Sequence, residues 1–234
     1  MRLGQPVIKV QTTAGVLNWK IDRLTAQEFV LGTYEPYMQR AFLSFVCPSA
    51  IVYDVGANAG FHSLFCGLLV GPSGKVIAFE PNPKNCASIE RQILVNPGIP
   101  VSIFPCALSD RCGTVGLVTS RGSRQCYVSD VGKISVEART IDSLINEGHI
   151  PPPELIKIDV EGHEEQVIKG SMDTLQRYKP VVLCDYNDDT TLPRMTGLLM
   201  PLGYTIKEGP PIIALPNVSY TGRENPNKEN LCES

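Results

Sequence analysis

Residues 51–60 are Ile51-Val52-Tyr53-Asp54-Val55-Gly56-Ala57-Asn58-Ala59-Gly60, an apolar run followed by a loop with two glycines. The run is short and rich in branched residues, which is typical of a parallel strand covered on both faces. Glycine lets the loop turn sharply and approach a ligand without interference from a Cβ atom. The segment therefore predicts a strand and a tight ligand-binding loop. The helix expected to follow has its apolar residues at one-face spacing: Phe61, Leu64, Phe65, Leu68 and Leu69.

The same alternation continues along most of the chain. Apolar runs of strand length recur, and segments with helical spacing separate most of them. Alternating strands and helices of this length indicate a parallel sheet covered on both faces. The predicted fold is α/β, a mostly parallel seven-stranded sheet with helices on both faces, in a single domain over residues 1–234. Beyond residue 60 the strands are expected at 75–79, 101–104, 155–159, 181–184, 204–207 and 212–215.

Residues 1–48 precede the core and have their own pattern. A β-hairpin is predicted for residues 6–21, with its turn at Ala14-Gly15. A helix with one apolar face is predicted from Pro36 to Val46. The edge of the hairpin is compatible with pairing to another chain, so an oligomer is compatible with the sequence.

Residues 49–216 form the predicted core, which is interrupted once. Residues 110–139 break the alternation and are expected to form a small antiparallel insertion around a Gly/Ser-rich loop. Residues 217–234 are polar and are expected to form a tail.

Composition narrows the class of partner. The 234-residue chain has a formal net charge of −3 and no block of lysine or arginine. This balance argues against a nucleic acid partner and against an anionic membrane surface. The most apolar run, residues 61–70, is too short to span a bilayer, and the N-terminus lacks the apolar core of a signal peptide. The sequence therefore predicts a cytoplasmic protein.

The eight cysteines show no pattern that indicates a metal site. None forms the C-x-x-C pair that zinc sites usually need. We expect reduced and mostly buried thiols at these positions: Cys47, Cys66, Cys86, Cys106, Cys112, Cys126, Cys184 and Cys232.

A carboxylate stands at the expected end of the second core strand. Ligands of open α/β sheets bind beyond the carboxyl ends of the strands. Glu80 follows the strand at 75–79 there, and a carboxylate can accept hydrogen bonds from both hydroxyls of a ribose. Asn82 and Pro83 then suit the cap and the first position of a helix. The sequence predicts a ligand that contains a nucleoside.

The glycine loop favours one nucleoside cofactor over another. NAD needs Gly-x-Gly-x-x-Gly, because its pyrophosphate presses on the loop. Here Asn58 and Phe61 occupy the second and third glycine positions, and Asp54 would repel a pyrophosphate. S-adenosylmethionine carries a sulfonium and an ammonium group, which suit an acidic loop. The sequence therefore predicts S-adenosylmethionine as the cofactor.

A second polar segment follows the strand at 155–159. It is Lys157-Ile158-Asp159-Val160-Glu161-Gly162-His163-Glu164, which places Asp159 at a strand end and His163 at the head of a helix. Together with residues 54–60, 79–83 and 107–110, this segment resembles the FkbM family of methyltransferases. The resemblance runs from about Tyr34 to Tyr204, most of the chain, in the family's order. It implies a Rossmann-like class I methyltransferase fold and O-methylation of a sugar, polyketide or other secondary metabolite.

The resemblance also implies roles for individual residues. Glu80 would bind the ribose, and Asp159 would lie near the transferred methyl group. Asp185 occupies the place of an acidic residue that the family commonly shows after the next strand. The implied contacts of the methionine end are Asp54, Gly56, Asn58 and Gly60. The implied neighbours of the adenine are Asn82 and the loop from Ala107 to Asp110.

Transfer to a hydroxyl also requires removal of a proton. The candidate bases are His163, Asp159, Glu161 and His62, and histidine titrates near neutrality. His62 is more often structural at such a position, and Glu35 is expected either to line the pocket or to lie on the surface. No metal is predicted, although Asp159, Glu161 and His163 also resemble a set of ligands for Mg²⁺ or Mn²⁺.

The expected partner is a small-molecule methyl acceptor. Its pocket is expected between the N-terminal region, the insertion at 110–139 and the loop after Asp185. Two alternatives stay open, a nicotinamide-dependent oxidoreductase and a non-catalytic nucleoside-binding module.

Overall fold

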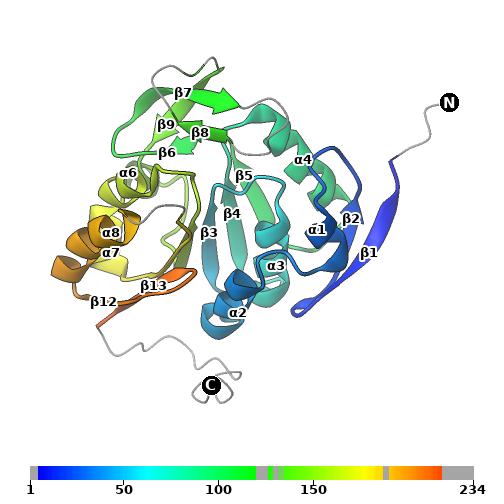
Figure 1. Cartoon of the computed structure of the whole chain (residues 1–234), viewed down its shortest axis with the longest axis horizontal. Helices are drawn as coiled ribbons and strands as arrows, with labels where there is room; N and C mark the ends of the chain where they lie inside the picture. The colour runs from blue at the N-terminus through cyan, green and yellow to red at the C-terminus, as the bar shows by residue number, and fades with distance from the viewer. Residues whose placement is uncertain (1–4, 120–125, 129–131, 133, 187–189, 218–234) are drawn as a thin grey trace.

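The structure is a computed structural model that describes residues 5–119, 126–128, 132, 134–186 and 190–217 (Figure 1). The polar tail predicted for residues 217–234 therefore lies, apart from Asn217, outside the described residues.

A seven-stranded sheet forms the centre of the molecule, as predicted. Its strand order is β12-β13-β11-β10-β3-β4-β5, and β13 is antiparallel to both of its neighbours. The chain moves from β3 outward to β4 and β5, then returns to place β10 on the other side of β3. This reversal leaves a crevice beyond the carboxyl ends of β3 and β10, where ligands of such sheets bind. The strands are β3 (Ile51–Val55), β4 (Lys75–Phe79), β5 (Val101–Phe104), β10 (Leu155–Ile158), β11 (Val181–Cys184), β12 (Tyr204–Lys207) and β13 (Ile212–Pro216).

Helices cover both faces of this sheet, which the apolar strands require. Tyr53 and Val55 of β3 belong to one buried apolar cluster, which also contains residues of α5 to α8. Val52, which directly precedes Tyr53, belongs to a second cluster with residues of α2 and α3 on the opposite face. Successive strand residues point to opposite faces, so both must be apolar. The helices are α1 (Gln27–Leu31), α2 (Pro36–Phe45), α3 (Phe61–Val70), α4 (Pro83–Leu94), α5 (Ile141–Asn146), α6 (Glu164–Lys169), α7 (Met172–Tyr178) and α8 (Thr191–Leu199), followed by the short helix η1 (Met200–Leu202).

The N-terminal hairpin is present, with its turn one residue earlier than predicted. Strands β1 (Val7–Thr12) and β2 (Gly15–Lys20) pair with Thr12 opposite Gly15, so Thr13 and Ala14 form the turn. The backbone N–H groups of Asn18 and Lys20 on β2 donate to side chains near the end of α4, at distances of 2.8 Å. These bonds join the β2 edge of the hairpin to the end of α4, while pairing of the hairpin with another chain stays a prediction.

The insertion forms a small sheet of its own with the order β6-β9-β7-β8. Its strands are β6 (Ala107–Leu108), β7 (Gly113–Thr119), β8 (Cys126–Val128) and β9 (Ile134–Arg139). The pair β7–β9 is antiparallel, as predicted for the insertion. Strand β8 was not predicted; it lies in the expected loop and also pairs with β7 in the antiparallel sense. The short strand β6 was not predicted; it pairs with β9 in parallel and joins the insertion to the loop after β5.

The described cysteines are free thiols. Five are buried and Cys112 is exposed, in agreement with the sequence, while the side chains of Cys126 and Cys232 lie outside the described residues.

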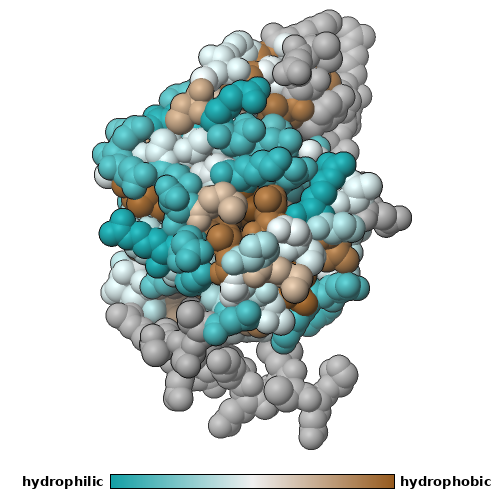
Figure 2. Space-filling view, turned by 90° about the vertical axis from the view of Figure 1, so that its left-hand side faces the viewer, coloured by the Kyte–Doolittle hydropathy of each residue, from teal (hydrophilic) through white to brown (hydrophobic). Residues whose placement is uncertain are grey.

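None of the described helices has the length and apolar character needed to cross a membrane. The surface on the side of α7 and α8 is mostly hydrophilic and surrounds a small hydrophobic patch (Figure 2).

Candidate active site

The loop after β3 approaches the loop after β10 so closely that only glycine fits. Gly56 has a φ of +80°, and a Cβ atom there would lie 1.9 Å from the carbonyl oxygen of Asp159. Gly60, with a φ of +88°, caps α3, and a Cβ atom there would lie 3.1 Å from Ile89. Steric contacts therefore explain why glycine occupies both positions of the loop, and Gly56 also allows two polar loops to approach each other.

Glu80 directly follows β4, as predicted, and fixes the shape of the same loop. Its two carboxylate oxygens accept hydrogen bonds from the backbone N–H groups of Asn58 and Asn82, each at 2.8 Å. Burial raises the pKa of Glu80 to about 7, although these bonds oppose the rise. Each carboxylate oxygen can accept more than one bond, so Glu80 keeps acceptor capacity for a ligand hydroxyl.

A cleft opens beside Glu80 and encloses about 630 Å³ of open space, solvent included. Its walls include Ala107, as expected, together with Leu117 and Val128 of the insertion sheet. The insertion thus contributes an apolar wall next to Glu80. Asn85, one turn into α4, also lines the cleft and donates a hydrogen bond to Glu80. Apolar walls beside a carboxylate and an amide fit a nucleoside.

A second, smaller cavity adjoins the cleft, and both are lined by Gly56, Asn58 and Asp159. The side-chain oxygen of Asn58 is buried and has no hydrogen-bond partner among the described residues. A buried acceptor without a donor is costly, so a ligand that donates there would be favoured. Acceptor groups of this kind fit the ammonium group of S-adenosylmethionine.

Asp54 lies behind the loop and lines neither cavity. Its carboxylate accepts a hydrogen bond from Ser63 at 2.5 Å and lies 3.1 Å from Nζ of Lys157. Burial raises the pKa of Asp54, but the charge of Lys157 and the hydrogen bonds that Asp54 accepts together outweigh burial and hold the pKa below its usual value. A direct contact of Asp54 with the cofactor stays a prediction, whereas its contact with Lys157 is structural.

Lys157 is a feature of the site to which the sequence assigned no role. Its Nζ lies 3.4 Å from Oδ2 of Asp159 and donates to the carbonyl oxygen of Gly56 at 3.3 Å. Burial lowers its pKa, but Asp54 and the other nearby carboxylates outweigh burial and raise the pKa well above the usual value. The signal in the sequence was a charged residue inside the apolar strand 155–158, because such a residue needs a buried partner.

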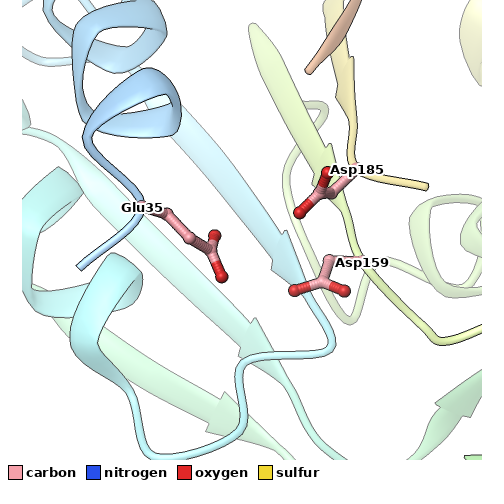
Figure 3. Close-up of side chains that lie close together, drawn as sticks. All are labelled: Glu35, Asp159 and Asp185. Atoms are coloured by element: carbon pink, nitrogen blue, oxygen red, sulfur yellow. The ribbon is translucent and has the colours of Figure 1, made fainter. Parts of the chain in front are cut away.

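Three carboxylates converge in front of Lys157. One oxygen from each of Glu35, Asp159 and Asp185 lies within 4.8 Å of the others, and their side chains point toward one another (Figure 3). The hydroxyl of Tyr37 donates to Asp185 at 2.8 Å. Glu35 therefore lines the site, which was one of two interpretations of the sequence.

The other predicted catalytic residues lie on the nucleoside side. Nε2 of His163 is 3.0 Å from the hydroxyl oxygen of Ser109, in the loop after β6, and burial lowers the pKa of this histidine. Glu161 lines the cleft but not the second cavity. Among the described residues, one group has metal-ligand spacing, and it contains neither His163 nor Glu161. The side chains of Asp159, Glu161 and His163 therefore do not come together as a set of metal ligands.

Two residues expected beside the adenine have other contacts. Asn82 caps α4, as predicted, by accepting a hydrogen bond from the N–H of Lys84 at 3.0 Å. Asp110 accepts from Ser109 at 3.2 Å and faces Arg111. Neither lines the two cavities, and Asn85 holds the position facing the cleft that was expected of Asn82.

Known proteins are similar to this chain in fold and in sequence. A solved methyltransferase FkbM from Methylobacillus flagellatus has a TM-score of 0.54 and 19% identity, over 82% of this chain and 56% of that one. At this identity the likeness concerns the fold. The hexuronic acid methyltransferase AglP of Haloferax volcanii is 28% identical over 171 residues, 70% of this chain and 64% of AglP. The 2-O-methyltransferase NoeI of Sinorhizobium fredii is 27% identical over 161 residues, 60% of this chain and 65% of NoeI.

The match therefore spans just under two thirds of the length of each of these two relatives. The family model described as the methyltransferase FkbM domain matches residues 54–204, which is more than half of the chain and includes the glycine loop, Glu80 and Asp159. The chain belongs to the FkbM methyltransferase domain family and has the fold of a class I methyltransferase.

Proposed function

We propose that the protein transfers the methyl group of S-adenosylmethionine to a hydroxyl of a small molecule such as a sugar, a polyketide or another secondary metabolite. The observation that carries this proposal is the arrangement of the two adjoining cavities. One has Glu80 in its wall and fits a nucleoside, and the other leads through Asp159 to the cluster of carboxylates. When bound, the cofactor supplies a methyl carbon already activated by its sulfonium.

The nucleoside end of the cofactor is assigned to the larger cleft. Glu80 accepts from the ribose hydroxyls, and Asn85 holds the Glu80 carboxylate in place. Gly56 and Asn58 line both cavities and are assigned to the methionine end. Gly60 supports this end by placing the start of α3 next to the loop.

The acceptor is assigned to the side of Glu35 and Asp185. Of the three predicted catalytic residues, Asp159 alone lines both cavities, and its carboxylate belongs to the acidic cluster. Proton removal is therefore assigned to this cluster rather than to His163, whose ring nitrogen contacts Ser109. The chain's part in the reaction is to align the hydroxyl with the methyl carbon and to accept its proton.

The relatives suggest which acceptors to examine first. AglP is a hexuronic acid methyltransferase, and NoeI is a 2-O-methyltransferase. Because this chain matches only part of each, the acceptor is proposed by class, with sugars and sugar acids as the first candidates.

Transfer of a deuterated methyl group to a panel of hydroxylated molecules tests the proposal. The full chain is incubated with trideuteromethyl S-adenosylmethionine and with uronic acids, neutral glycosides or macrolides, and products are analysed by mass spectrometry. We expect one labelled methyl group on an oxygen of one class, and loss of this product in Asp159→Asn. A label found only on nitrogen or carbon would overturn O-methylation. NADH binding without S-adenosylhomocysteine binding would instead indicate an oxidoreductase.

A further inference from the structure

We infer that Glu35, Asp159 and Asp185 form a binding site for a divalent cation of the Mg²⁺ or Mn²⁺ class at the acceptor end of the site.

The three carboxylates come from separate parts of the chain. Glu35 precedes α2, Asp159 follows β10 and Asp185 follows β11 (Figure 3). Their nearest oxygens all lie within 4.8 Å of one another. Two oxygens bound to one Mg²⁺ at ~2.1 Å are at most about 4.2 Å apart, so small side-chain adjustments are enough to bind an ion.

The local charge favours a cation at this position. The ion pairs of Lys157 go to Asp54 and Asp159, and its charge also acts on Glu35, so one positive charge serves three carboxylates. Among the described residues, neither Glu35 nor Asp185 forms an ion pair with a lysine or arginine. Carboxylates held this close repel one another, and a divalent cation between them removes that repulsion.

A buried imidazole gives a second and independent indication. The side chain of His62 is 4% exposed, and its Nε2 lies 3.7 Å from Oε2 of Glu35. Neither atom has a hydrogen-bond partner among the described residues. Two polar atoms with no partner thus face the same space from different elements, α3 and the start of α2. An ion or an ion-bound water would satisfy them, because carboxylate oxygen and imidazole nitrogen are both metal ligands.

The position gives the ion a use that rests on the proposed function. Asp159 also lines the cavity assigned to the methionine end of the cofactor. A cation with one oxygen from each carboxylate keeps open positions, and an acceptor hydroxyl bound there would lose its proton more readily, to a carboxylate oxygen of the cluster that does not bind the ion. The expected acceptors carry a second oxygen next to the reacting hydroxyl, so that both oxygens can bind the ion.

Binding of Mn²⁺ to the metal-stripped full chain, without cofactor, tests the site directly. Loss of the free Mn²⁺ signal in electron paramagnetic resonance is expected to show one site per chain. Glu35→Gln and Asp185→Asn are each expected to weaken binding by about tenfold or more. The exposed residues Glu28 and Asp173 give matched controls, Glu28→Gln and Asp173→Asn, which are expected to bind like the wild type.

The three histidines of the chain locate the ion in the unmodified protein, so the test does not depend on folded variants. Bound Mn²⁺ is expected to broaden the ring signals of His62 before those of His163 and His149. Broadening led by His163 or His149 would place the ion elsewhere and overturn the inference. So would the absence of binding at millimolar Mn²⁺, or equal binding in all four variants. S-adenosylhomocysteine binding, measured on the same sample, separates these outcomes from failure of the proposed function.

Discussion

The ammonium group of Lys157 lies 3.1 Å from a carboxylate oxygen of Asp54, and both side chains are almost completely buried. The pair sits under the glycine loop, where Lys157 also donates to the carbonyl oxygen of Gly56. It therefore connects β10 to the loop after β3, and the shape of the site depends on it.

Removal of the lysine is expected to destabilise the fold strongly. Lys157→Met leaves the buried Asp54 without its counter-charge, a change that costs about 3–5 kcal/mol in comparable pairs. Urea unfolding measures this loss. The half-exposed Lys169, which pairs with Glu165 on the surface of α6, supplies the control, and Lys169→Met should cost less than about 1 kcal/mol. Equal costs for both variants would show that the buried pair has no special role.

The close approach at Gly56 is expected to make this position intolerant of a side chain. Gly56→Ala places a Cβ atom 1.9 Å from the carbonyl oxygen of Asp159, so a loop must move. Gly71 also has a positive φ, of +64°, but a Cβ atom there meets nothing within 4 Å. Gly71 combines this φ with a ψ of −174°, a region essentially restricted to glycine, so Gly71→Ala should cost about 1–3 kcal/mol through backbone strain alone. Gly56→Ala should lose more stability and also bind S-adenosylhomocysteine more weakly. Equal ligand binding by the two variants would contradict a role of this close approach in shaping the ligand-binding loop.

The stability of the protein is expected to depend on pH through Glu80. Burial raises its folded pKa to about 7, above the value of 4.5 for an ordinary glutamate. The folded state therefore binds more protons than the unfolded state between these values, and stability falls as pH rises through that window. Ionisation of Glu80 lowers the free energy of unfolding by at most about 3 kcal/mol, and the whole decrease is reached above pH 7.

Glu80→Gln removes this proton uptake. Unfolding free energies measured from pH 5 to 8 should fall less steeply in the variant than in the wild type. Glu35, whose pKa burial also raises to about 7, contributes to both proteins and cancels in the comparison. Parallel curves for the two proteins would contradict the assignment to Glu80.

Substitution of two neighbouring asparagines is expected to lower stability at one position and ligand affinity at the other. Asn82 caps α4, so Asn82→Ala should cost about 1 kcal/mol in unfolding free energy and leave ligand affinity nearly unchanged. Asn85 lines the cleft and bonds to Glu80, so Asn85→Ala should weaken S-adenosylhomocysteine binding. Calorimetry measures the ligand affinity of both variants, and urea unfolding measures their stability. Weaker ligand binding in Asn82→Ala than in Asn85→Ala would indicate that Asn82, and not Asn85, contacts the cofactor.

The sequence predicted the parts of this protein that local patterns encode. Short apolar runs gave the seven strands, and Glu80 was predicted at a strand end because the run 75–79 ends there. The parallel pairing of β6 was missed because a two-residue strand carries no periodicity.

The acidic cluster shows why a site is harder to predict than a fold. Asp159 and Asp185 follow neighbouring parallel strands, so their proximity follows from the strand order. Glu35 reaches them from outside the sheet, at a φ of 43° before α2, and no local pattern encodes where that helix packs. Asn85 was missed for a related reason, since its contact with Glu80 depends on the direction in which α4 leaves the strand.

Calorimetric titration with S-adenosylhomocysteine of the wild type, Glu80→Gln and the exposed-site control Glu90→Gln tests the central claim most directly. We expect one molecule to bind per chain, with affinity unchanged in the control. The Glu80 variant should bind at least about tenfold more weakly, because a hydrogen bond to a charged group contributes about 1.5–3 kcal/mol. No binding to the wild type at millimolar ligand, or equal affinity in all three proteins, would contradict the claim that this cleft holds the cofactor of a methyltransferase.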